Sequence, residues 1–457
     1  MSSAMRQSRF GRGASLARLL LRIGGRYAAR SPRLLFASVK QREELRYDLA
    51  FRSADDVAEE LGSMKGVLMK VGQMASYIYE DLPDYFRAAM GRLQQNAPPM
   101  SPELSSSVIE EEFGDVPERV FAEWDPLPFA AASIGQVHRA ITKDGRAVAV
   151  KVQYPGIAAS ITSDMRNAAL VRKIIGAAFR GLDVESLVNE LGERLKEEVD
   201  YRREAENQEL FATYYEGHPV IHVPHVIKEF STGRVLTTEL VVGSSFEELL
   251  TWSQREKDLA AETIYRFVFR SLYRLHAFNG DPHPGNYLFH GGGRVTFLDF
   301  GLTKRFTGDD LAPLEDAVRF IVFEKDYEAF RHALERAGFL KAGAPVSTQL
   351  VVDRFGQFYS TVMEDAPMTM TPEFSSAIVR RFFDARSPLA PYSDVPRVYV
   401  VMQRINLGLY AVLGSLHAHA NWRRIAEEIW PFKNGPPATP IGEAEARWEQ
   451  DRAKVPA

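Results

Sequence analysis

The sequence predicts an α+β protein in which a small β-rich lobe lies between an amino-terminal helical segment and a large helical lobe. Three observations predict this arrangement. Residues 43–113 carry helical patterns that are separated by proline-containing corners. Between residues 121 and 153 apolar and polar residues alternate, with a turn at Lys143-Asp144-Gly145. Residues 309–430 return to mostly helical patterns.

The composition is that of an ordinary globular protein. The chain has 457 residues, of which 45% are hydrophobic and 25% are charged, so it is long enough for two or three domains with sizeable cores. The net charge of −4 gives no reason to expect a nucleic acid partner. Because the chain has no cysteine, disulfides and thiolate metal sites are excluded.

We expect five segments along the chain. They are a basic segment, a helical extension, the β-rich lobe with inserted helices, the helical lobe, and a poorly ordered tail rich in Pro, Ala, Glu and Arg. Their boundaries are 1–42, 43–115, 116–242, 243–431 and 432–457. Within the lobes we expect strands at Val223–Phe230 and Arg234–Leu240 and a hairpin that turns at Gly291–Gly293.

The first segment is strongly basic. Residues 1–42 carry ten Lys or Arg and no Asp or Glu. Arginines recur at every fourth position from Arg18 to Arg30, and apolar residues follow helical spacing on a largely opposite face. This pattern is typical of a basic amphipathic helix on an anionic membrane surface, and equally of a solvated helix beside the core. A start rich in arginine and free of acids is also similar to an organellar transit peptide.

The sequence predicts no membrane span. The longest uncharged stretch, residues 405–422, contains Asn and His, which favours a buried helix. Any membrane contact is therefore expected to be peripheral. We expect a cytoplasmic protein, or a mitochondrial one in a eukaryote.

The most informative motif runs from Asn279 to Asn286 and is followed by Asp299-Phe300-Gly301. Asp281 stands five residues before Asn286, and Asp299 thirteen residues after it, across the predicted hairpin. A protein-kinase-like catalytic loop presents its base and its metal ligands in this order. Carboxylates and amides hold Mg²⁺ on the phosphates, and one carboxylate orients the acceptor. The spaced set is much more specific than an isolated Asp-Phe-Gly.

A second element is Lys151, at the end of an alternating strand. A lysine on a strand is what a kinase-like lobe aims at the α- and β-phosphates. Taken alone, Lys151 would be better explained as an exposed lysine at a strand end, but the hairpin before it and the catalytic loop after it reverse that preference. Where a kinase carries a glycine-rich phosphate loop, this chain has Ala130, Ala131, Ala132 and Ser133. Because alanine resists positive φ, we expect a stiffer loop and poor transfer to protein substrates, although three alanines could also simply form a tight turn.

Together these motifs resemble the UbiB/AarF/ADCK family of atypical kinases, most closely its branch tied to coenzyme Q synthesis. The resemblance covers about residues 50 to 430. It includes a KxGQ signature and an ExD signature besides the motifs above. These signatures are Lys70-Val71-Gly72-Gln73 and Glu198-Val199-Asp200. The resemblance implies a bilobal protein-kinase-like fold with an amino-terminal helical extension.

The resemblance also implies roles for single residues. Lys151 resembles the phosphate lysine, Glu204 its helix partner, and Asp281 the catalytic-loop aspartate. Asn286 and Asp299 resemble the Mg²⁺ ligands, and the adenine-binding hinge is expected near Glu239, Leu240 and Val241. Lys70 and Gln73 belong to an extension that in this family folds over the peptide site, with Glu198 and Asp200 as its acidic counterparts.

The ExD spacing leaves alternatives open. On a regular helix Glu198 and Asp200 point about 200° apart, whereas Asp200 and Glu204 share a face. Either the helix is distorted near Val199, or the two carboxylates serve different partners, such as Lys70 and the nucleotide. A solvated charged helix would explain the spacing as well.

We therefore expect an atypical kinase or ATPase with ATP and Mg²⁺ as cofactors, acting on a small or lipid-associated acceptor in support of isoprenoid quinone synthesis. Expected partners besides ATP are an anionic membrane surface, a quinone-precursor lipid and quinone-biosynthesis proteins. One alternative is an ATP-gated scaffold without catalysis. The others are a true protein kinase and a small-molecule phosphotransferase.

Overall fold

The computed structural model describes residues 100–132, 134–157, 199–280, 282–382, 387–396 and 398–454. The chain forms two compact units. Unit 1 holds the residues up to Arg202 together with Lys228–Thr237, and unit 2 holds Arg203–Ile227 and the residues from Thr238 on. The basic segment, most of the helical extension and the expected inserted helices fall outside the described residues.

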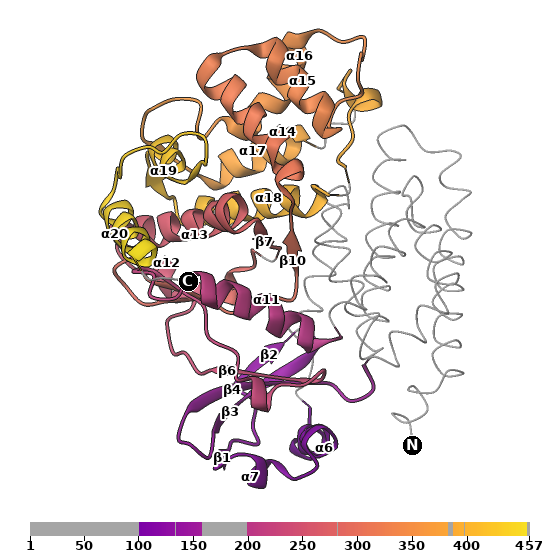
Figure 1. The fold of residues 1–457 in the computed structure, drawn as a ribbon, viewed down its shortest axis with the longest axis vertical. Coiled ribbons are helices and arrows are strands. Elements are labelled where there is room, and N and C mark those ends of the chain that lie inside the picture. Colours follow the sequence, from indigo (N-terminus) through magenta and orange to yellow (C-terminus); the bar gives the residue numbers. More distant parts are fainter. Residues whose placement is uncertain are drawn as a thin grey trace, which may run out of the picture. The chain divides into compact units, whose positions relative to one another are not determined.

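Unit 1 is built on a β-sheet (Figure 1). Strands β1, β2 and β4 pair antiparallel with β3, and β6 lies beside β4. In β4 every second residue is fully buried, which is the period-two pattern of a strand. The elements are α6 (Pro102–Phe113), α7 (Pro117–Val120), β1 (Glu123–Trp124), β2 (Ala130–Ala132), β3 (Gly135–Ile141), β4 (Ala147–Gln153) and β6 (Val235–Glu239).

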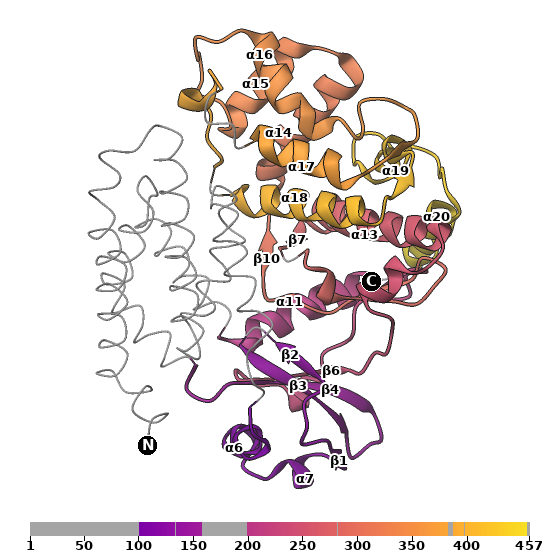
Figure 2. The same ribbon diagram turned by 180° about the vertical axis from the view of Figure 1, so that it is seen from behind.

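Unit 2 is mostly helical and carries short strands (Figures 1 and 2). Strand β9 pairs with β5 and β8, β10 with β7, and β12 with β11. The helices are α11 (Tyr201–Tyr214, which begins in unit 1), α12 (Phe246–Leu250), α13 (Gln254–Leu275), α14 (Gly308–Val318), a π-helical turn (Arg319–Glu324), α15 (Tyr327–Ala337), α16 (Thr348–Phe355), α17 (Pro372–Phe382), α18 (Val400–Ser415), α19 (Trp422–Ile429) and α20 (Pro440–Lys454). The strands are β5 (Ile221–His222), β7 (Ala277–Asn279), β8 (Tyr287–Phe289), β9 (Val295–Phe297), β10 (Thr303–Arg305), β11 (Met368–Thr369) and β12 (His419–Ala420).

Helix α13 runs through the core of unit 2 and leads to the catalytic-loop motif. It begins after Ser253, whose side chain accepts a hydrogen bond from the Glu256 N–H, and it ends at His276 in the left-handed conformation. The ring of Phe267 stacks on Phe297 of β9 at 3.6 Å between centroids. The chain then enters β7 directly, so the packing of α13 sets where the motif starts.

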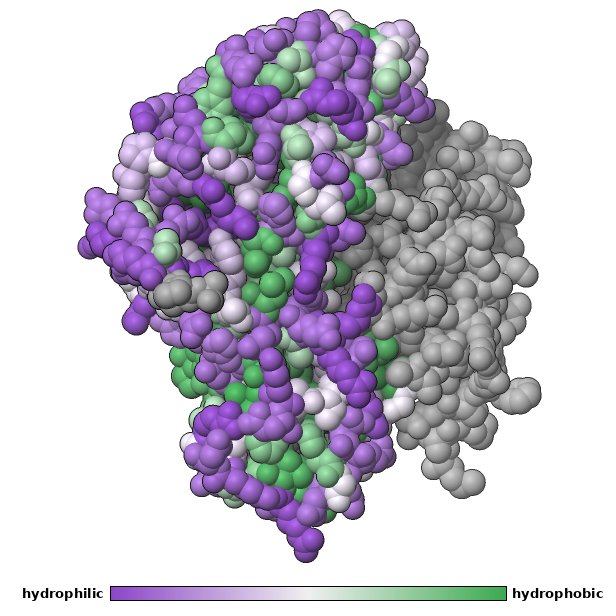
Figure 3. Space-filling view, in the orientation of Figure 1, coloured by the Kyte–Doolittle hydropathy of each residue, from purple (hydrophilic) through white to green (hydrophobic). Residues whose placement is uncertain are grey.

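Several expectations about single elements are confirmed. The β3–β4 hairpin turns at residues 142–146, where the Thr142 N–H donates to the Arg146 carbonyl. The β8–β9 hairpin turns at Gly291–Gly293, all three of which have positive φ. Residues 405–422 contribute to α18 rather than to a span, and no helix in the described part of the chain is long and apolar enough to cross a bilayer. Figure 3 shows a mostly hydrophilic described surface on the face it presents, with apolar areas interspersed.

Two expectations are wrong. No strand occupies Val223–Phe230, because β5 ends at His222, Val226 forms only an isolated bridge with Thr238, and Lys228–Phe230 form a 3₁₀ turn. Pro224 lacks an N–H for a strand ladder, and its carbonyl accepts a hydrogen bond from the Gln208 side chain instead. The tail predicted as poorly ordered from 432 on instead contains helix α20. Ile441, Glu445 and Trp448 are buried at the i, i+4 and i+7 positions of one helix face. The sequence did not predict this buried face because the segment is mostly polar and a glutamate occupies the centre of the face.

A buried ion network joins α20 to α13. The Arg266 guanidinium, with no exposed side-chain surface, contacts Glu262 at 2.8 Å, Glu428 at 2.8 Å and Glu445 at 2.7 Å. Glu445 also contacts Arg270 at 3.3 Å and the His218 Nε2 at 2.9 Å. Burial by itself would raise the pKa of Glu445, but the hydrogen bond from His218 and the charges of Arg270 and Arg266 outweigh it and lower this pKa to about 2.

The hydrogen bonds of His218 define a neutral imidazole. Its Nδ1 accepts from the N–H of Ile221 at 3.0 Å, so the ring proton is on Nε2, which donates to Glu445. Burial lowers the pKa of His218 from its usual 6.5, against the opposing effect of Glu445. The nearby charges of Arg270 and Arg266 lower it further, and Tyr215 and Trp448 pack on the ring.

We expect the His218→Gln variant to lose less stability on acidification than the natural protein. Because the pKa of His218 is lower in the folded than in the unfolded chain, its contribution is complete above pH 6.5 and is lost as the pH falls through the folded pKa. The free energy of unfolding, measured by urea denaturation between about pH 7.5 and 5, should therefore have a shallower slope in this variant. His332→Gln, at a histidine with a side-chain exposure of 64%, is the control and should keep the natural slope. Equal slopes in all three proteins would contradict the assignment.

Candidate nucleotide-binding site

The two predicted metal ligands, Asn286 and Asp299, flank the β8–β9 hairpin at its open end. In the β8–β9 ladder Tyr287 pairs with Phe297, which sets Asn286 opposite Leu298. The Leu298 N–H donates to the Asn286 carbonyl at 3.0 Å. Asp299 follows directly, so the backbone positions of Asn286 and Asp299 lie at the same end of the hairpin. The Asn286 Nδ2 is buried and makes no hydrogen bond within the described residues.

The start of the catalytic-loop motif is hydrogen-bonded to the Asp-Phe-Gly segment and to strand β10. The Asn279 side chain donates to the Asp299 carbonyl at 2.7 Å. The Asn279 backbone pairs with Thr303 in the β7–β10 ladder. One Asp299 carboxylate oxygen accepts from the Gly301 N–H at 3.0 Å. Asp281 itself lies outside the described residues, but both chain ends that flank it are in place.

Helix α11 holds the next residue, Phe300. The Phe300 ring is fully buried and lies 4.8 Å from the ring of Phe211. The Asn207 side chain donates to the Phe300 carbonyl at 3.2 Å. One polar and one apolar contact therefore attach α11 to the Asp-Phe-Gly segment.

Glu204 of α11 faces the same segment. Its side chain is buried, with 6% of the residue exposed. A Cβ added at Gly301 would lie 3.6 Å from the Glu204 Oε2 and 3.4 Å from the Asp299 Oδ1. Both carboxylates thus approach one point beside Gly301. Like charges this close raise each other's free energy unless positive charge compensates them.

In unit 1, Lys151 lies on β4 opposite Val137 of β3. Its Nζ is 5.0 Å from the centroid of the Tyr201 ring, within the range of a cation–π interaction. Ala130–Ala132 form strand β2, paired with residues 135–137, so the alanine segment is tied to the sheet rather than folded as a tight turn. Ser133 lies outside the described residues.

The expectation that Asp200 and Glu204 share a helical face is wrong, because α11 begins only at Tyr201. Asp200 instead accepts a hydrogen bond from the Arg202 N–H at 3.1 Å. The Gln153 side chain holds the Val199 carbonyl at 2.7 Å, outside any regular helix. Val199 and Asp200 are thus not helical, and the two alternatives for the partners of the ExD carboxylates stay a prediction. Glu198, Lys70 and Gln73 lie outside the described residues.

The expected hinge follows β6. The Glu239 N–H donates to the His225 carbonyl at 3.1 Å, and its carboxylate accepts from the His225 N–H at 3.0 Å. This carboxylate is therefore occupied in holding the strand end. Leu240 and Val241 follow in irregular backbone before α12.

Sequence reasoning missed Asn207, Asn279 and Tyr201. Asn279 stands at the head of the catalytic-loop motif and Tyr201 directly after the ExD signature. The only signal in the sequence for Asn279 and Tyr201 was their position next to a motif. Asn207 and Asn279 bind residues far away in the sequence, which no local pattern predicts.

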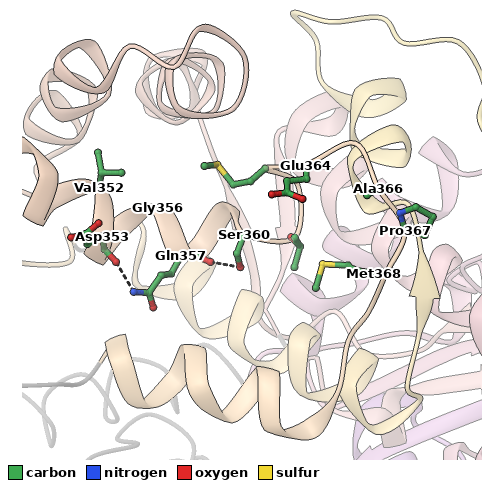
Figure 4. Close-up of a pocket in the computed structure, with 11 residues that line it drawn as sticks. Val352, Asp353, Gly356, Gln357, Ser360, Glu364, Ala366, Pro367 and Met368 are labelled. Atoms are coloured by element: carbon green, nitrogen blue, oxygen red, sulfur yellow. Dashed lines mark hydrogen bonds between the residues drawn. The ribbon is translucent and has the colours of Figure 1, made fainter.

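A cavity of about 610 Å³ lies elsewhere in unit 2, between α16 and β11 (Figure 4). Its rim residues Asp353, Glu364 and Ala366 are exposed. None of the predicted site residues lines it. The lining residues are Val352, Asp353, Gly356, Gln357, Ser360, Thr361, Met363, Glu364, Ala366, Pro367 and Met368.

The sheet of unit 1 and the hairpin and helices of unit 2 define a protein of the protein-kinase-like class. A family described as ABC1 atypical kinase-like domain matches residues 92–334. The chain therefore belongs to the ABC1 atypical kinase-like family, which confirms the resemblance found in the sequence. Membership of a kinase-like family implies nucleotide binding.

Known relatives agree with this assignment. Atypical kinase COQ8B, mitochondrial, from Rattus norvegicus is 34% identical over 302 residues, which cover 65% of this chain and 57% of the rat protein. Atypical kinase COQ8, mitochondrial, from Saccharomyces cerevisiae is 31% identical over 263 residues, which cover 57% of this chain and 52% of the yeast protein. The chain thus spans about half the length of these curated relatives.

The fold is also that of a solved structure. The complex of Rv3197 with erythromycin from Mycobacterium tuberculosis matches with a TM-score of 0.63 and 30% identity, over 86% of this chain and 100% of that chain. This match, with the family assignment, confirms the predicted protein-kinase-like α+β fold.

We expect Gly280→Ala to destabilise the protein and to disturb the catalytic loop. An added Cβ would lie 2.4 Å from the Leu302 carbonyl oxygen, so β7 and β10 would have to separate where the loop begins. The free energy of unfolding should fall by ~1–3 kcal/mol, as in other overpacked positions. Gly308→Ala is the control, because nothing lies within 4 Å of a Cβ added there. If denaturation showed the two variants to be equally stable, the close approach at Gly280 would be refuted.

Proposed function

We propose that the protein binds ATP with Mg²⁺ and hydrolyses it or transfers its phosphoryl group to a small or lipid-associated acceptor. The observation that supports this proposal is the backbone placement of Asn286 and Asp299 at one end of the β8–β9 hairpin. In a kinase-like catalytic loop the metal-binding amide and carboxylate follow in this order along the chain.

The donor set suits a hard divalent cation. An amide and a carboxylate supply oxygen ligands, which Mg²⁺ prefers, and Mg²⁺ ordinarily completes its shell with phosphate oxygens and water. The described residues contain no group of three or more His, Asp and Glu side chains that could hold a metal by themselves. A cation at Asn286 and Asp299 would therefore depend on the nucleotide, whose phosphate charge it would neutralise.

The remaining roles follow the family resemblance. Lys151 would contact the α- and β-phosphates, with Glu204 as its acidic partner. Asp281 would orient the acceptor and take up its proton, and the backbone near Glu239 and Val241 would contact adenine. The alanine strand Ala130–Ala132 would limit closure over the γ-phosphate.

The choice of acceptor rests on the family resemblance. Lys70, Gln73, Glu198 and Asp200 match the elements that in this family cover the peptide site, so we infer a smaller acceptor than a protein. The resemblance to the coenzyme Q branch, together with the COQ8 relatives, supports a role in isoprenoid quinone synthesis. On this proposal the protein acts in contact with a membrane lipid or with quinone-biosynthesis proteins.

We expect Asp299→Asn to remove the Mg²⁺-dependent part of the stabilisation by ATP. The variant keeps the shape of the side chain but lacks the negative charge that holds the cation. In a thermal shift assay, ATP at a hundred times its dissociation constant adds ~2.7 kcal/mol of stability to a protein that binds it. That gain should need Mg²⁺ in the natural protein and disappear in the variant. Asp309→Asn, at an exposed residue at the start of α14, is the matched control. Full Mg²⁺-dependent stabilisation of Asp299→Asn would remove Asp299 from the metal site.

We expect Asp281→Asn to bind ATP normally but to lose turnover by a factor of ~10²–10⁴, the usual effect of a lost proton acceptor. Release of inorganic phosphate, with and without liposomes that contain a quinone-precursor mimic, measures this. Undiminished ATPase activity in the variant would exclude Asp281 as the base. Nucleotide binding without turnover in the natural protein would favour the ATP-gated scaffold, and transfer to a peptide would favour a protein kinase.

A further inference from the structure

We propose that the carboxy-terminal helix α20 positions helix α11, and through it Glu204 and the Asp-Phe-Gly segment. The catalytic consequence rests on the function proposed above, whereas the mechanical link between the helices does not. Helix α20 lies more than a hundred residues beyond the stretch 92–334 that matches the kinase-like family. Nothing in that family match assigns it a role.

Helix α20 contacts the last turn of α11 and the residues that follow it (Figures 1 and 2). The Trp448 indole N–H donates to the Glu216 carbonyl at 2.9 Å. The Trp448 ring stacks on Tyr215 at 6.4 Å and meets Tyr214 edge-on at 6.2 Å. Arg452 lies over the Tyr214 ring and donates to the Tyr214 carbonyl. This carbonyl closes α11, so α20 supplies the partner that a helix end otherwise lacks.

The same end of α11 is attached to α13. The Tyr215 hydroxyl lies 2.8 Å from the Ser271 Oγ and 3.2 Å from the Phe267 carbonyl. Glu445 of α20 contacts Arg266 and Arg270 of α13 from the other side. The end of α11 is therefore held between α13, which leads to the catalytic loop, and α20.

The opposite half of α11 carries the chemistry. Glu204 approaches Gly301 and Asn207 binds the Phe300 carbonyl, while Phe211, nearer the Tyr214 end, packs on the Phe300 ring. An α-helix of 14 residues is a rod about 21 Å long. A tilt at its Tyr214 end therefore moves Glu204. In protein kinases the position of the corresponding helix controls the lysine–glutamate pair.

Detachment of α20 would be costly, which makes the contact a fixed one. Arg266 and Arg270 are almost completely buried and would lose the carboxylate of Glu445. Tyr215 and His218 would lose the Trp448 ring that covers them. Small changes at α20 should thus shift α11 without unfolding unit 2.

The test compares substitutions on α20 by two independent readouts. Trp448→Ala removes the ring and the indole N–H, and Trp448→Phe keeps a ring. Arg452→Ala, at an exposed residue, removes the contact with the end of α11 and the guanidinium over the Trp448 ring but keeps that ring, and is the milder variant should Trp448→Ala fold poorly. Glu443→Gln changes an exposed residue of the same helix and is the control. Amide hydrogen exchange of residues 201–214 and steady-state ATP turnover are measured at a temperature where each variant is folded.

We expect Trp448→Ala to accelerate exchange in α11 and to lower kcat by about 10-fold or more, since a misplacement of about 1 Å can cost ~10²-fold in rate. Arg452→Ala should show a smaller change in the same direction, and Trp448→Phe should recover most of the turnover. Glu443→Gln should match the natural protein in both measurements. Unchanged exchange in α11 for both Trp448→Ala and Arg452→Ala would overturn the proposal. So would faster exchange with unchanged turnover.

The two levels of the proposal fail in different ways. If the natural protein shows no turnover at all, the proposed function fails, and the exchange measurement still decides whether α20 holds α11. If turnover is present and α11 exchange is unaffected by Trp448→Ala and Arg452→Ala, the function stands and the positioning role is refuted.

Discussion

Two asparagine side chains fix the backbone of Asp299 and Phe300, and the geometry of the candidate site depends on these two hydrogen bonds. Asn279 binds the Asp299 carbonyl from the start of the catalytic-loop motif, and Asn207 binds the Phe300 carbonyl from α11. Each bond contributes ~1 kcal/mol net, but a carbonyl left buried without a partner costs ~1–3 kcal/mol. Neither asparagine can therefore become apolar without moving the segment that carries Asp299. The buried Phe300 ring then makes that segment continuous with the core of unit 2.

Charge is handled differently in the site and in the core. Around Arg266 the chain supplies both signs, and Glu445 is shared by two arginines and a histidine. Beside Gly301, by contrast, the carboxylates of Asp299 and Glu204 approach the same point. The first arrangement is self-compensated and serves structure. The second brings two carboxylates close together, and carboxylate oxygens are ligands that a divalent cation prefers.

Local pattern was sufficient for the parts of the fold whose signal is local. The β3–β4 and β8–β9 hairpins followed from alternation and turn residues, and the second of these set Asn286 beside Asp299. The start of α11 was not predictable in this way. The Asp200 carboxylate caps the helix by accepting a hydrogen bond from the Arg202 N–H. The Gln153 side chain donates to the Val199 carbonyl, and this bond joins residues 46 apart in the sequence. Composition led to the wrong prediction of a poorly ordered tail in place of α20. The buried face of α20 contains Glu445, whose burial is favourable only next to Arg266, far away in the sequence.

The roles assigned to α11 follow from its weakness as an isolated helix. Its sequence is mostly polar, and helices of 14 residues are marginal in water without tertiary contacts. Its position must therefore come from the tertiary contacts of its buried face. Phe211 and Asn207 anchor it to Phe300, and Tyr215 anchors the following turn to α13. A change at the Tyr214 end of α11 can therefore reach the acidic side of the site, because one continuous helix joins the two.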